Sequence, residues 1–173
     1  NSAGDILIRP LTTFRDLSEH PLIRGHIPIL AQAADSVGGP QIRAMGTVGG
    51  NISNGVTSAD TASSLFALEA MLTIRGVNSE RVIPIADYYL GPGQVSLQPG
   101  ELLTLITVRA ASYQGYGGCY LKYAMRQAMD IATLGTAVLV KPLPDKRHIE
   151  TLRLAFGVAA PTPLRAHTTE AAL

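Results

Sequence analysis

The chain has 173 residues, of which 46% are hydrophobic and 16% are charged, and its formal net charge is +1. A nearly neutral chain lacks the basic surface that nucleic-acid binding requires, and no apolar run approaches the roughly 18 residues that span a bilayer. The single cysteine excludes an internal disulfide and any zinc or iron–sulfur centre built from several thiolates. The length suits one domain, or one domain and part of another.

The first forty residues predict one short strand followed by short helices. The strand is expected at 5–9. Thr13, followed three residues later by Asp16, has the pattern of a capping box and predicts a short helix. Pro28 suits a first helical turn, and the apolar residues after it recur at helical spacing until the Gly-Gly-Pro sequence at 38–40.

The middle of the chain combines a polar loop, a helix and a hairpin. Residues 38–58 are rich in Gly, Ser and Asn and are expected to form a loop. Asp60 then begins a second helix that ends at about residue 70. The β-like runs at 71–75 and 81–85 flank a Gly-containing turn and predict a β-hairpin.

The last third of the chain is dominated by strand patterns. Residues 89–100 contain several Gly and Pro and predict a loop, and residues 102–108 predict a strand. The small, polar and Gly-rich stretch at 110–118 indicates a junction between two domains. Further strand candidates follow it at 119–124, 131–140 and 152–158.

The glycine-rich stretch at 46–55 carries the clearest chemical signal. Paired glycines let backbone N–H groups approach a ligand, and successive N–H groups can form an anion-binding nest. The nearby hydroxyl and amide side chains can bond phosphate oxygens, and Asp60 can accept from ribose hydroxyls. The stretch is neither a Walker loop nor a Rossmann fingerprint. Two interpretations stay open: a site for a phosphate-bearing cofactor, or a tight loop whose polar groups satisfy one another.

Three stretches resemble a known family. Residues 38–52 resemble the second FAD-binding motif in the flavoprotein subunits of molybdenum hydroxylases, a family that covers xanthine dehydrogenase, aldehyde oxidoreductase and carbon monoxide dehydrogenase. Residues 121–132 look like the start of the C-terminal flavoprotein domain of that family, and 152–163 are similar to its next strand and turn. The Ser-Ala-Asp sequence at 58–60 looks closest to bacterial xanthine dehydrogenases.

The resemblance implies an α+β fold in two parts. Residues 1–109 would be the second subdomain of a FAD-binding domain of the PCMH or vanillyl-alcohol-oxidase type. Residues 110–118 would be a linker, and 119–173 the beginning of a domain like the C-terminal domain of carbon monoxide dehydrogenase flavoproteins. The first phosphate loop of the family is missing, so the chain is expected to be a fragment with an incomplete FAD site.

The resemblance also implies which residues contact FAD, and it implies no catalytic or metal-binding residue in this chain. Leu103 would pack on the adenine or isoalloxazine, and Lys122 would reach towards the flavin from the next domain. The residues implied at the diphosphate are Thr47, Gly49, Gly50 and Asn51. Those implied along the ribityl or adenosine part are Asn54, Ser58 and Asp60.

The implied role is electron transfer in the cytoplasm. Molybdopterin and [2Fe–2S] centres would lie on partner subunits, and electrons would pass from those centres through FAD to NAD or another acceptor. The lone Cys119 agrees with this division, because one thiolate cannot hold a cluster. Lys122 and Arg126 would stabilise negative charge on the reduced flavin or steer a dinucleotide.

Alternative interpretations of two residue pairs and of the function stay open. Arg126 and Asp130 are interpreted as a structural pair, and the adjacent tyrosines at 88 and 89 as a packed pair that could instead face the flavin. A rival function is a non-catalytic interaction module with an incomplete cofactor site. A generic phosphate-binding domain fits the glycines but not the stretches at 122–132 and 152–163.

Overall fold

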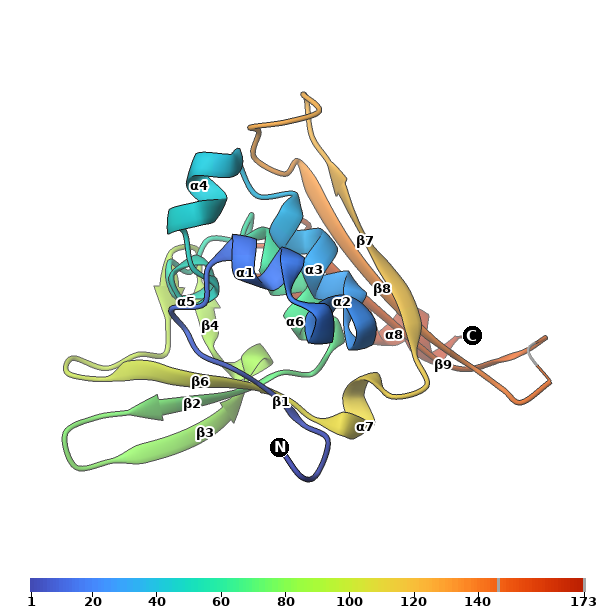
Figure 1. Ribbon diagram of the computed structural model, residues 1–173, viewed down its shortest axis with the longest axis horizontal. Coiled ribbons are helices and arrows are strands. Elements are labelled where there is room, and N and C mark those ends of the chain that lie inside the picture. Colours follow the sequence, from blue (N-terminus) through green and yellow to red (C-terminus); the bar gives the residue numbers. More distant parts are fainter. Residues whose placement is uncertain (146, 173) are drawn as a thin grey trace.

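The computed structural model describes residues 1–145 and 147–172 and has the predicted α+β class. Helices α1–α6 lie against two four-stranded antiparallel sheets, one at the bottom and one at the right of Figure 1. The first sheet has the order β1-β6-β2-β3 and the second the order β10-β9-β8-β7. A short ladder joins β4 (Tyr89–Gly91) to β5 (Gln94–Val95).

The bounds of the remaining elements follow the chain. The strands are β1 (Ile6–Ile8), β2 (Met71–Arg75), β3 (Glu80–Pro84), β6 (Leu102–Val108), β7 (Gly117–Tyr123), β8 (Leu134–Pro142), β9 (Ile149–Gly157) and β10 (Leu164–Arg165). The helices are α1 (Phe14–Glu19), α2 (Pro21–His26), α3 (Pro28–Asp35), α4 (Pro40–Met45), α5 (Val48–Ser53), α6 (Asp60–Ala67), α7 (Ala110–Tyr113) and α8 (His167–Ala171), with a 3₁₀ turn at Ile85–Asp87.

Several local predictions are confirmed. The Thr13 hydroxyl accepts from the Asp16 N–H at 3.1 Å, and the Asp16 carboxylate accepts from the Thr13 N–H at 3.3 Å, which completes the capping box of α1. Pro28 occupies the first turn of α3. Strands β2 and β3 form the expected hairpin, whose turn is closed by a bond from the Gly76 N–H to the Ser79 carbonyl.

Two predicted loops contain regular structure. Residues 38–58 form α4 and α5, because Pro40 occupies the first turn of α4 and the Thr47 hydroxyl caps α5. Residues 89–100 contain the β4–β5 ladder. Gly, Ser and Asn content predicted the first loop and Gly and Pro content the second, whereas local capping and a tight turn order the backbone in these places.

The predicted linker at 110–118 is also ordered, because it contains α7 and the start of β7. The first N–H of α7, on Ala110, donates to the Asp5 carboxylate at 2.9 Å. The hydroxyl of Tyr113, which is buried, donates to the Gly4 carbonyl at 2.6 Å. Residues at the start of the chain therefore fix a segment that composition alone marks as a flexible junction.

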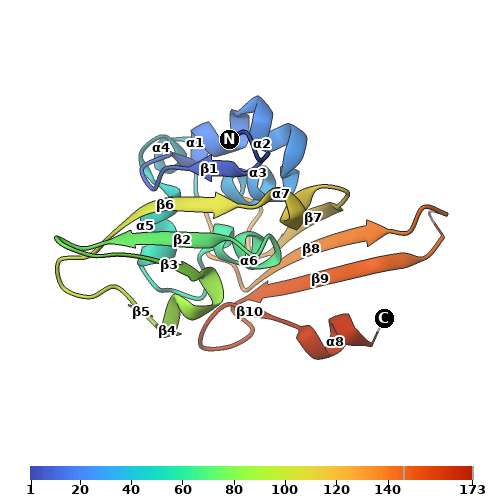
Figure 2. The same ribbon diagram turned by 90° about the horizontal axis from the view of Figure 1, so that it is seen from below.

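One hydrophobic core connects the two sheets through the helices. It includes Leu72 and Ile106 from the first sheet, Leu65 from α6, and Ala137 from the second sheet. Every residue of α6 is buried, because this helix packs against α3, β8 and β9. Figure 2 shows the first sheet from below, with the second sheet beside it. In the part of the chain that the structure describes, no helix has the length and apolarity needed to cross a membrane.

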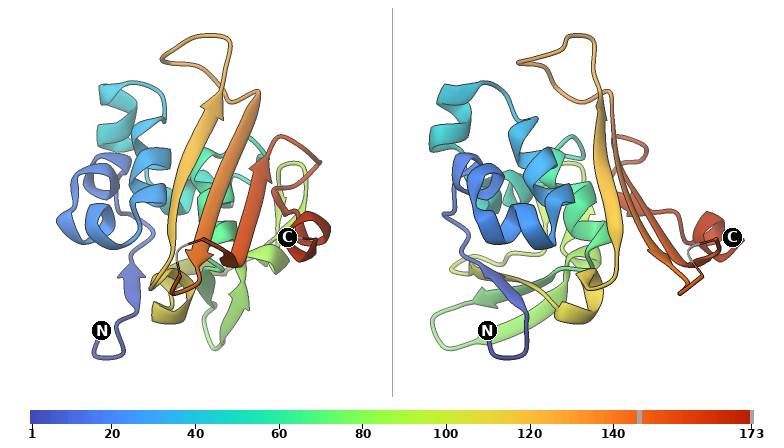
Figure 3. Two further views of the ribbon diagram at one scale, coloured as in Figure 1. Left: turned by 90° about the vertical axis from the view of Figure 1, so that its right-hand side faces the viewer. Right: turned by 45° about the vertical axis from the view of Figure 1, so that its right-hand side comes forward.

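Helices α3 and α6 pack on one face of the second sheet, and α8 lies beside β9, away from them (Figure 3). The residues that alternate along β7, β8 and β9 on the opposite face are paired in register, and most of them are partly buried, whereas Leu121 is 61% exposed. Cys119 lies beside Val138, which in turn lies beside Leu154. The next residues on this face, Leu121, Thr136 and Phe156, carry no charge either.

Candidate functional site

A cavity of about 440 Å³ lies between the ends of α3–α6 and the segment 124–133 that connects β7 to β8. Its volume falls in the range of about 300–1,000 Å³ that is typical of small-molecule sites. The predicted site residues Asn51, Ser58 and Asp60 all line it. Its other lining residues are Val37, Gly38, Ile42, Val56, Ala59, Arg126, Met129, Asp130 and Ile131.

Asp60, which lines this cavity, forms an ion pair with Lys122. The Lys122 ammonium donates to Asp60 Oδ2 at 3.1 Å and to the Ser36 carbonyl at 3.2 Å. The Tyr120 hydroxyl donates to Asp60 Oδ1 at 2.8 Å. The side chains of Asp60 and Lys122 are only 9% and 12% exposed. Lys122 also lines a second hollow of about 330 Å³, bounded by Ser36 and residues 122–130.

The electrostatics of this pair follow from its burial. Burial raises the pKa of Asp60 above its ordinary value, while the Tyr120 hydroxyl and the Lys122 ammonium oppose the rise. Burial and the adjacent Asp60 carboxylate raise the pKa of Tyr120. The phenol therefore stays protonated and acts as a donor across the neutral pH range. Lys122 provides the positive charge that accompanies the buried carboxylate.

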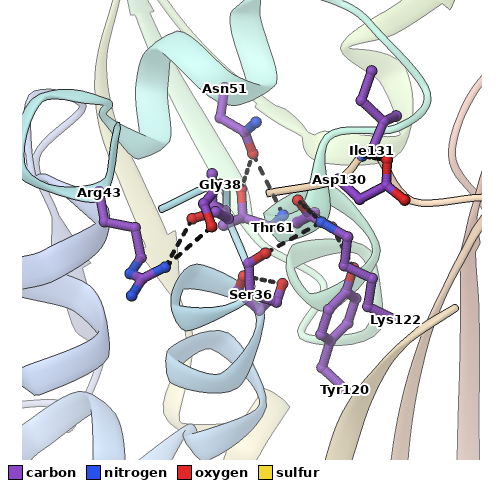
Figure 4. Close-up of polar contacts among 12 residues, drawn as sticks. Ser36, Gly38, Arg43, Asn51, Thr61, Tyr120, Lys122, Asp130 and Ile131 are labelled. Carbon is purple, nitrogen blue, oxygen red and sulfur yellow. Dashed lines mark hydrogen bonds and ion pairs between the residues drawn. The ribbon is translucent and has the colours of Figure 1, made fainter. Parts of the chain in front are cut away.

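Asn51 links α5 to α6 beside the pair. Its side-chain carbonyl accepts from the Thr61 hydroxyl at 2.6 Å and from the Thr61 N–H at 3.4 Å. The amide nitrogen of Asn51 points away from Thr61 (Figure 4). The side chain is therefore oriented by its own protein contacts, and its N–H₂ donors are directed elsewhere.

The glycine-rich turn uses its own N–H groups within the protein. The N–H groups of Val48 and Gly49 donate to the carbonyls of Thr12 and Pro10, at 3.0 and 2.8 Å. The next two N–H groups donate to the hydroxyl and the carbonyl of Thr47, at 3.2 and 3.0 Å. The expected nest of free N–H donors is therefore not present at this turn, because capping and packing of α5 occupy those donors. The hydroxyl proton of Thr47 is left to donate.

Gly49 and Gly50 of this turn differ in what lies in the space that a side chain would occupy. A Cβ on Gly49 would lie 2.4 Å from the Pro10 Cβ, so close packing inside the protein requires this glycine. Gly50 is exposed, and a Cβ there would meet only the Thr47 hydroxyl, at 3.1 Å. Gly50, unlike Gly49, leaves room for an external group.

Six of the nine predicted site residues are not among those that line this cavity: Thr47, Gly49 and Gly50 of the glycine-rich turn, Lys122 of the ion pair, and Asn54 and Leu103. Asn54 is exposed and ends α5 as its C-cap. Leu103 belongs to β6 in the first sheet, where it is half-buried and packs against the core. Its immediate environment is protein, and among the described residues it is not one that lines the cavity.

Segment 124–133 closes one side of the cavity through contacts of its own. The Asp130 carboxylate accepts from the N–H groups of Arg126 and Ile131, and the Arg126 guanidinium donates to the Met129 carbonyl. Burial opposes the charge of Asp130, but these N–H bonds and Arg126 outweigh it and lower the pKa of Asp130. Arg126 and Asp130 lie 3.6 Å apart as the predicted pair.

Sequence reasoning missed Tyr120 and the α3 residues that support it. The Gln32 side-chain carbonyl accepts from the Tyr120 N–H at 2.8 Å, and Ser36 contributes its carbonyl to Lys122. A signal for Tyr120 was available, because residues two apart on a strand share one face. The contribution of α3 had no such signal, since it depends on how the helix packs on β7.

Comparison with known proteins identifies the family. Residues 1–109 match the family described as the FAD-binding domain in molybdopterin dehydrogenase. Residues 119–173 match the C-terminal domain of carbon monoxide dehydrogenase flavoproteins. The chain belongs to this flavoprotein family. Among the described residues, no group of three or more His, Cys, Asp or Glu is arranged to hold a metal ion.

Relatives and solved structures agree with this membership. The xanthine dehydrogenase FAD-binding subunit of Escherichia coli O157:H7 is 43% identical over 96% of this chain and 56% of the relative. The carbon monoxide dehydrogenase medium chain of Hydrogenophaga pseudoflava is 33% identical over 92% of this chain and 54% of the relative. A structure of carbon monoxide dehydrogenase from that organism superposes with a TM-score of 0.91 at 33% identity, over 98% of this chain and 57% of that one. The chain thus spans a little over half the length of the relatives it matches.

Proposed function

We propose that this chain is part of the FAD-binding component of a molybdenum hydroxylase of the xanthine dehydrogenase type. In this role it passes electrons from [2Fe–2S] centres through FAD to NAD or another acceptor. Molybdopterin and the iron–sulfur centres lie on partner subunits in the cytoplasm. The observation that carries the proposal is the cavity between the two family-matched regions, with the Asp60–Lys122 pair at its wall.

The residues of the cavity fit part of an FAD molecule. Val37, Ile42 and Val56 offer apolar surface of the kind that packs on an aromatic ring. Asn51 and Ser58 add polar groups on the same lining, suited to hydroxyl or carbonyl oxygens. This mixture of apolar surface with a few polar groups is typical of cofactor sites.

We assign the contact with the FAD diphosphate to side-chain donors, not to a nest of backbone N–H groups. The N–H groups of the turn are engaged, so the Thr47 hydroxyl proton and the Asn51 amide are the donors we assign to phosphate oxygens. The exposed Gly50 permits close approach at the same turn. Gly49 acts indirectly, by allowing α5 to pack on Pro10. The contacts of Asn54 and Leu103 with FAD, which the family resemblance implies, stay predictions.

FAD, when bound, supplies the reversible uptake and release of electrons. The chain supplies binding and electrostatics. Lys122 and Arg126 bring positive charge to the two hollows on either side of segment 124–133, where negative charge on a cofactor is stabilised. The Lys122 side chain is 12% exposed, so its charge is less screened by water than that of Arg126, whose side chain is 69% exposed.

The test is a titration of FAD into the purified chain, followed by flavin fluorescence, with AMP as a competitor. We expect saturable binding that AMP reverses. Replacing Asn51→Ala removes a donor from the cavity and is expected to weaken binding about tenfold, the equivalent of one hydrogen bond of about 1.4 kcal/mol. Asn78→Ala, in the exposed turn between β2 and β3, is the matched control and leaves the affinity unchanged.

A second function, an interaction module with an incomplete FAD site, is favoured by two observations. The N–H groups of the glycine-rich turn are engaged within the protein, and the face of the second sheet opposite α3 and α6 carries the uncharged residues Cys119, Val138 and Leu154. Absence of saturable FAD binding by a folded chain would favour this function. Binding that Asn51→Ala weakens and Asn78→Ala does not would exclude it.

A further inference from the structure

Tyr120 lies behind Asp60, which lines the cavity, and is held by contacts on three sides. Its hydroxyl donates to Asp60 Oδ1 and its N–H donates to the Gln32 side chain. Its ring lies over Gly135 of the neighbouring strand, where a Cβ would come within 3.0 Å of the phenol oxygen. Tyr120 is 7% exposed. A buried hydroxyl held this firmly can fix the group that it contacts.

We propose that Tyr120 is a positioning residue that fixes the orientation and the charge of the Asp60–Lys122 pair at the cofactor cavity. The inference rests on the proposed function, because the pair matters for the cofactor only if FAD occupies that cavity. The phenol holds one carboxylate oxygen of Asp60 and leaves the other to the Lys122 ammonium. Each donor therefore has its own acceptor, and the ammonium stays in one place.

Among the described residues, the groups around the Asp60 carboxylate show that Tyr120 is the one that orients it together with Lys122. From β7, Tyr120 and Lys122 face Asp60 directly. From segment 124–133, Arg126 and Asp130 line the same cavity but bond to each other and to their own segment. From α3, Gln32 and Ser36 contribute uncharged groups to Tyr120 and Lys122. Without the phenol, the carboxylate would lose a hydrogen bond to its charged form and keep only Lys122, so protonation would become easier.

The first experiment needs no cofactor. The carboxyl carbons of all aspartates are labelled with ¹³C, the Asp60 signal is assigned with Asp60→Asn, and its titration is followed by NMR. Tyr120→Phe removes one hydrogen bond to the charged carboxylate, so we expect the pKa of Asp60 to rise by about one. Tyr123→Phe is the matched control, because Tyr123 lies on the same strand but is 66% exposed, and it leaves the titration unchanged.

If Tyr120→Phe does not fold, a second variant that keeps the phenol ring and hydroxyl still tests the inference. Gly135→Ala pushes the hydroxyl away from its present position and is expected to raise the pKa of Asp60 in the same direction. A folded Tyr120→Phe or Gly135→Ala protein whose Asp60 titrates as in the unmodified chain overturns the inference.

The second experiment connects Tyr120 to FAD. The Kd for FAD is measured by flavin fluorescence between pH 5 and pH 8 for the unmodified chain, Tyr120→Phe and Tyr123→Phe. We expect Tyr120→Phe to weaken binding about tenfold and to move the midpoint of its pH dependence upward with the pKa of Asp60. A purely structural role would lower affinity equally at every pH and would contradict the inference. If the unmodified chain fails to bind FAD, the proposed function fails, whereas the NMR titration still decides what Tyr120 does to Asp60.

Discussion

The glycine-rich turn at 46–51 and the Asp60–Lys122 pair lie on neighbouring elements but use their polar groups in opposite ways. In the turn, successive N–H groups are bonded to carbonyls and to a hydroxyl of the protein itself. At the pair, a buried carboxylate and a buried ammonium meet across the boundary between the two family-matched regions. The N–H groups of the turn hold the protein's own backbone together, whereas the pair places charge at a cavity.

This difference shows why motif glycines are ambiguous. Gly49 is needed because Pro10 lies against it, and this need would exist with or without a ligand. Burial of the Asp60 carboxylate, by contrast, opposes folding except where Lys122 and Tyr120 compensate for it. Four substitutions can break or sharpen the contrast, from the largest expected effect to the smallest.

Gly49→Ala is expected to destabilise the fold by about 3 kcal/mol. Its Cβ would lie 2.4 Å from the Pro10 Cβ and 2.7 Å from the Pro10 carbonyl oxygen, which forces α5 away from its support. Gly50→Ala is the matched control and should change stability by less than about 1 kcal/mol, because its Cβ meets only one hydroxyl. Urea unfolding measures both, and equal losses would remove the distinction between the two glycines.

Lys122→Met is expected to cost about 2 kcal/mol of folding free energy at pH 7, because it leaves the buried Asp60 carboxylate with Tyr120 alone. The loss should shrink towards pH 5, as Asp60 takes up a proton more readily. Lys141→Met removes a pair with Glu150 whose side chains are 37% and 41% exposed, and it should cost less than about 1 kcal/mol. Similar losses in the two variants would mean that burial adds nothing to the Asp60 pair.

Thr47→Ala is expected to cost about 1 kcal/mol, because it removes the hydroxyl that accepts from the Gly50 N–H at the start of α5. Thr47→Ser keeps that acceptor and should stay within a few tenths of a kcal/mol of the unmodified chain. Thermal unfolding provides the comparison. A serine variant as unstable as the alanine variant would show that the methyl group, not the cap, stabilises the turn.

The smallest expected effect is a change with pH in the free energy of unfolding of the unmodified chain relative to Asp60→Asn. The pKa of Asp60 is raised in the folded state, so its contribution to stability is fully present below the unfolded pKa of about 3.9 and is lost as pH rises through the folded pKa. The stability of the unmodified chain relative to Asp60→Asn should therefore fall between pH 4 and pH 7. Urea midpoints across that range measure it, and a rising difference would mean that Lys122 and Tyr120 outweigh burial.

Local elements were predictable where a short pattern decides the backbone. The capping box at Thr13, the proline of α3 and the β2–β3 hairpin all formed as expected, because each depends on residues within a few positions. The order imposed on 110–118 was not predictable, since it depends on Asp5 and Gly4 more than a hundred positions away. In the candidate site, Asn51, Ser58 and Asp60 were predicted and share one cavity, whereas Tyr120 was missed.

The sequence by itself determined the family, the α+β class and the residue types available for a cofactor, because these are carried by motifs and by periodicity along the chain. The tertiary structure decided which of those groups remain available. Packing of α5 on Pro10 and Thr12 engaged the N–H groups of the glycine-rich turn. Packing of α6 against β8 and β9, together with packing of α3 on β7, brought Asp60 to Lys122 and Tyr120. Hydrogen-bond satisfaction is a property of the folded chain as a whole, and a motif does not show which of its donors the protein itself will occupy.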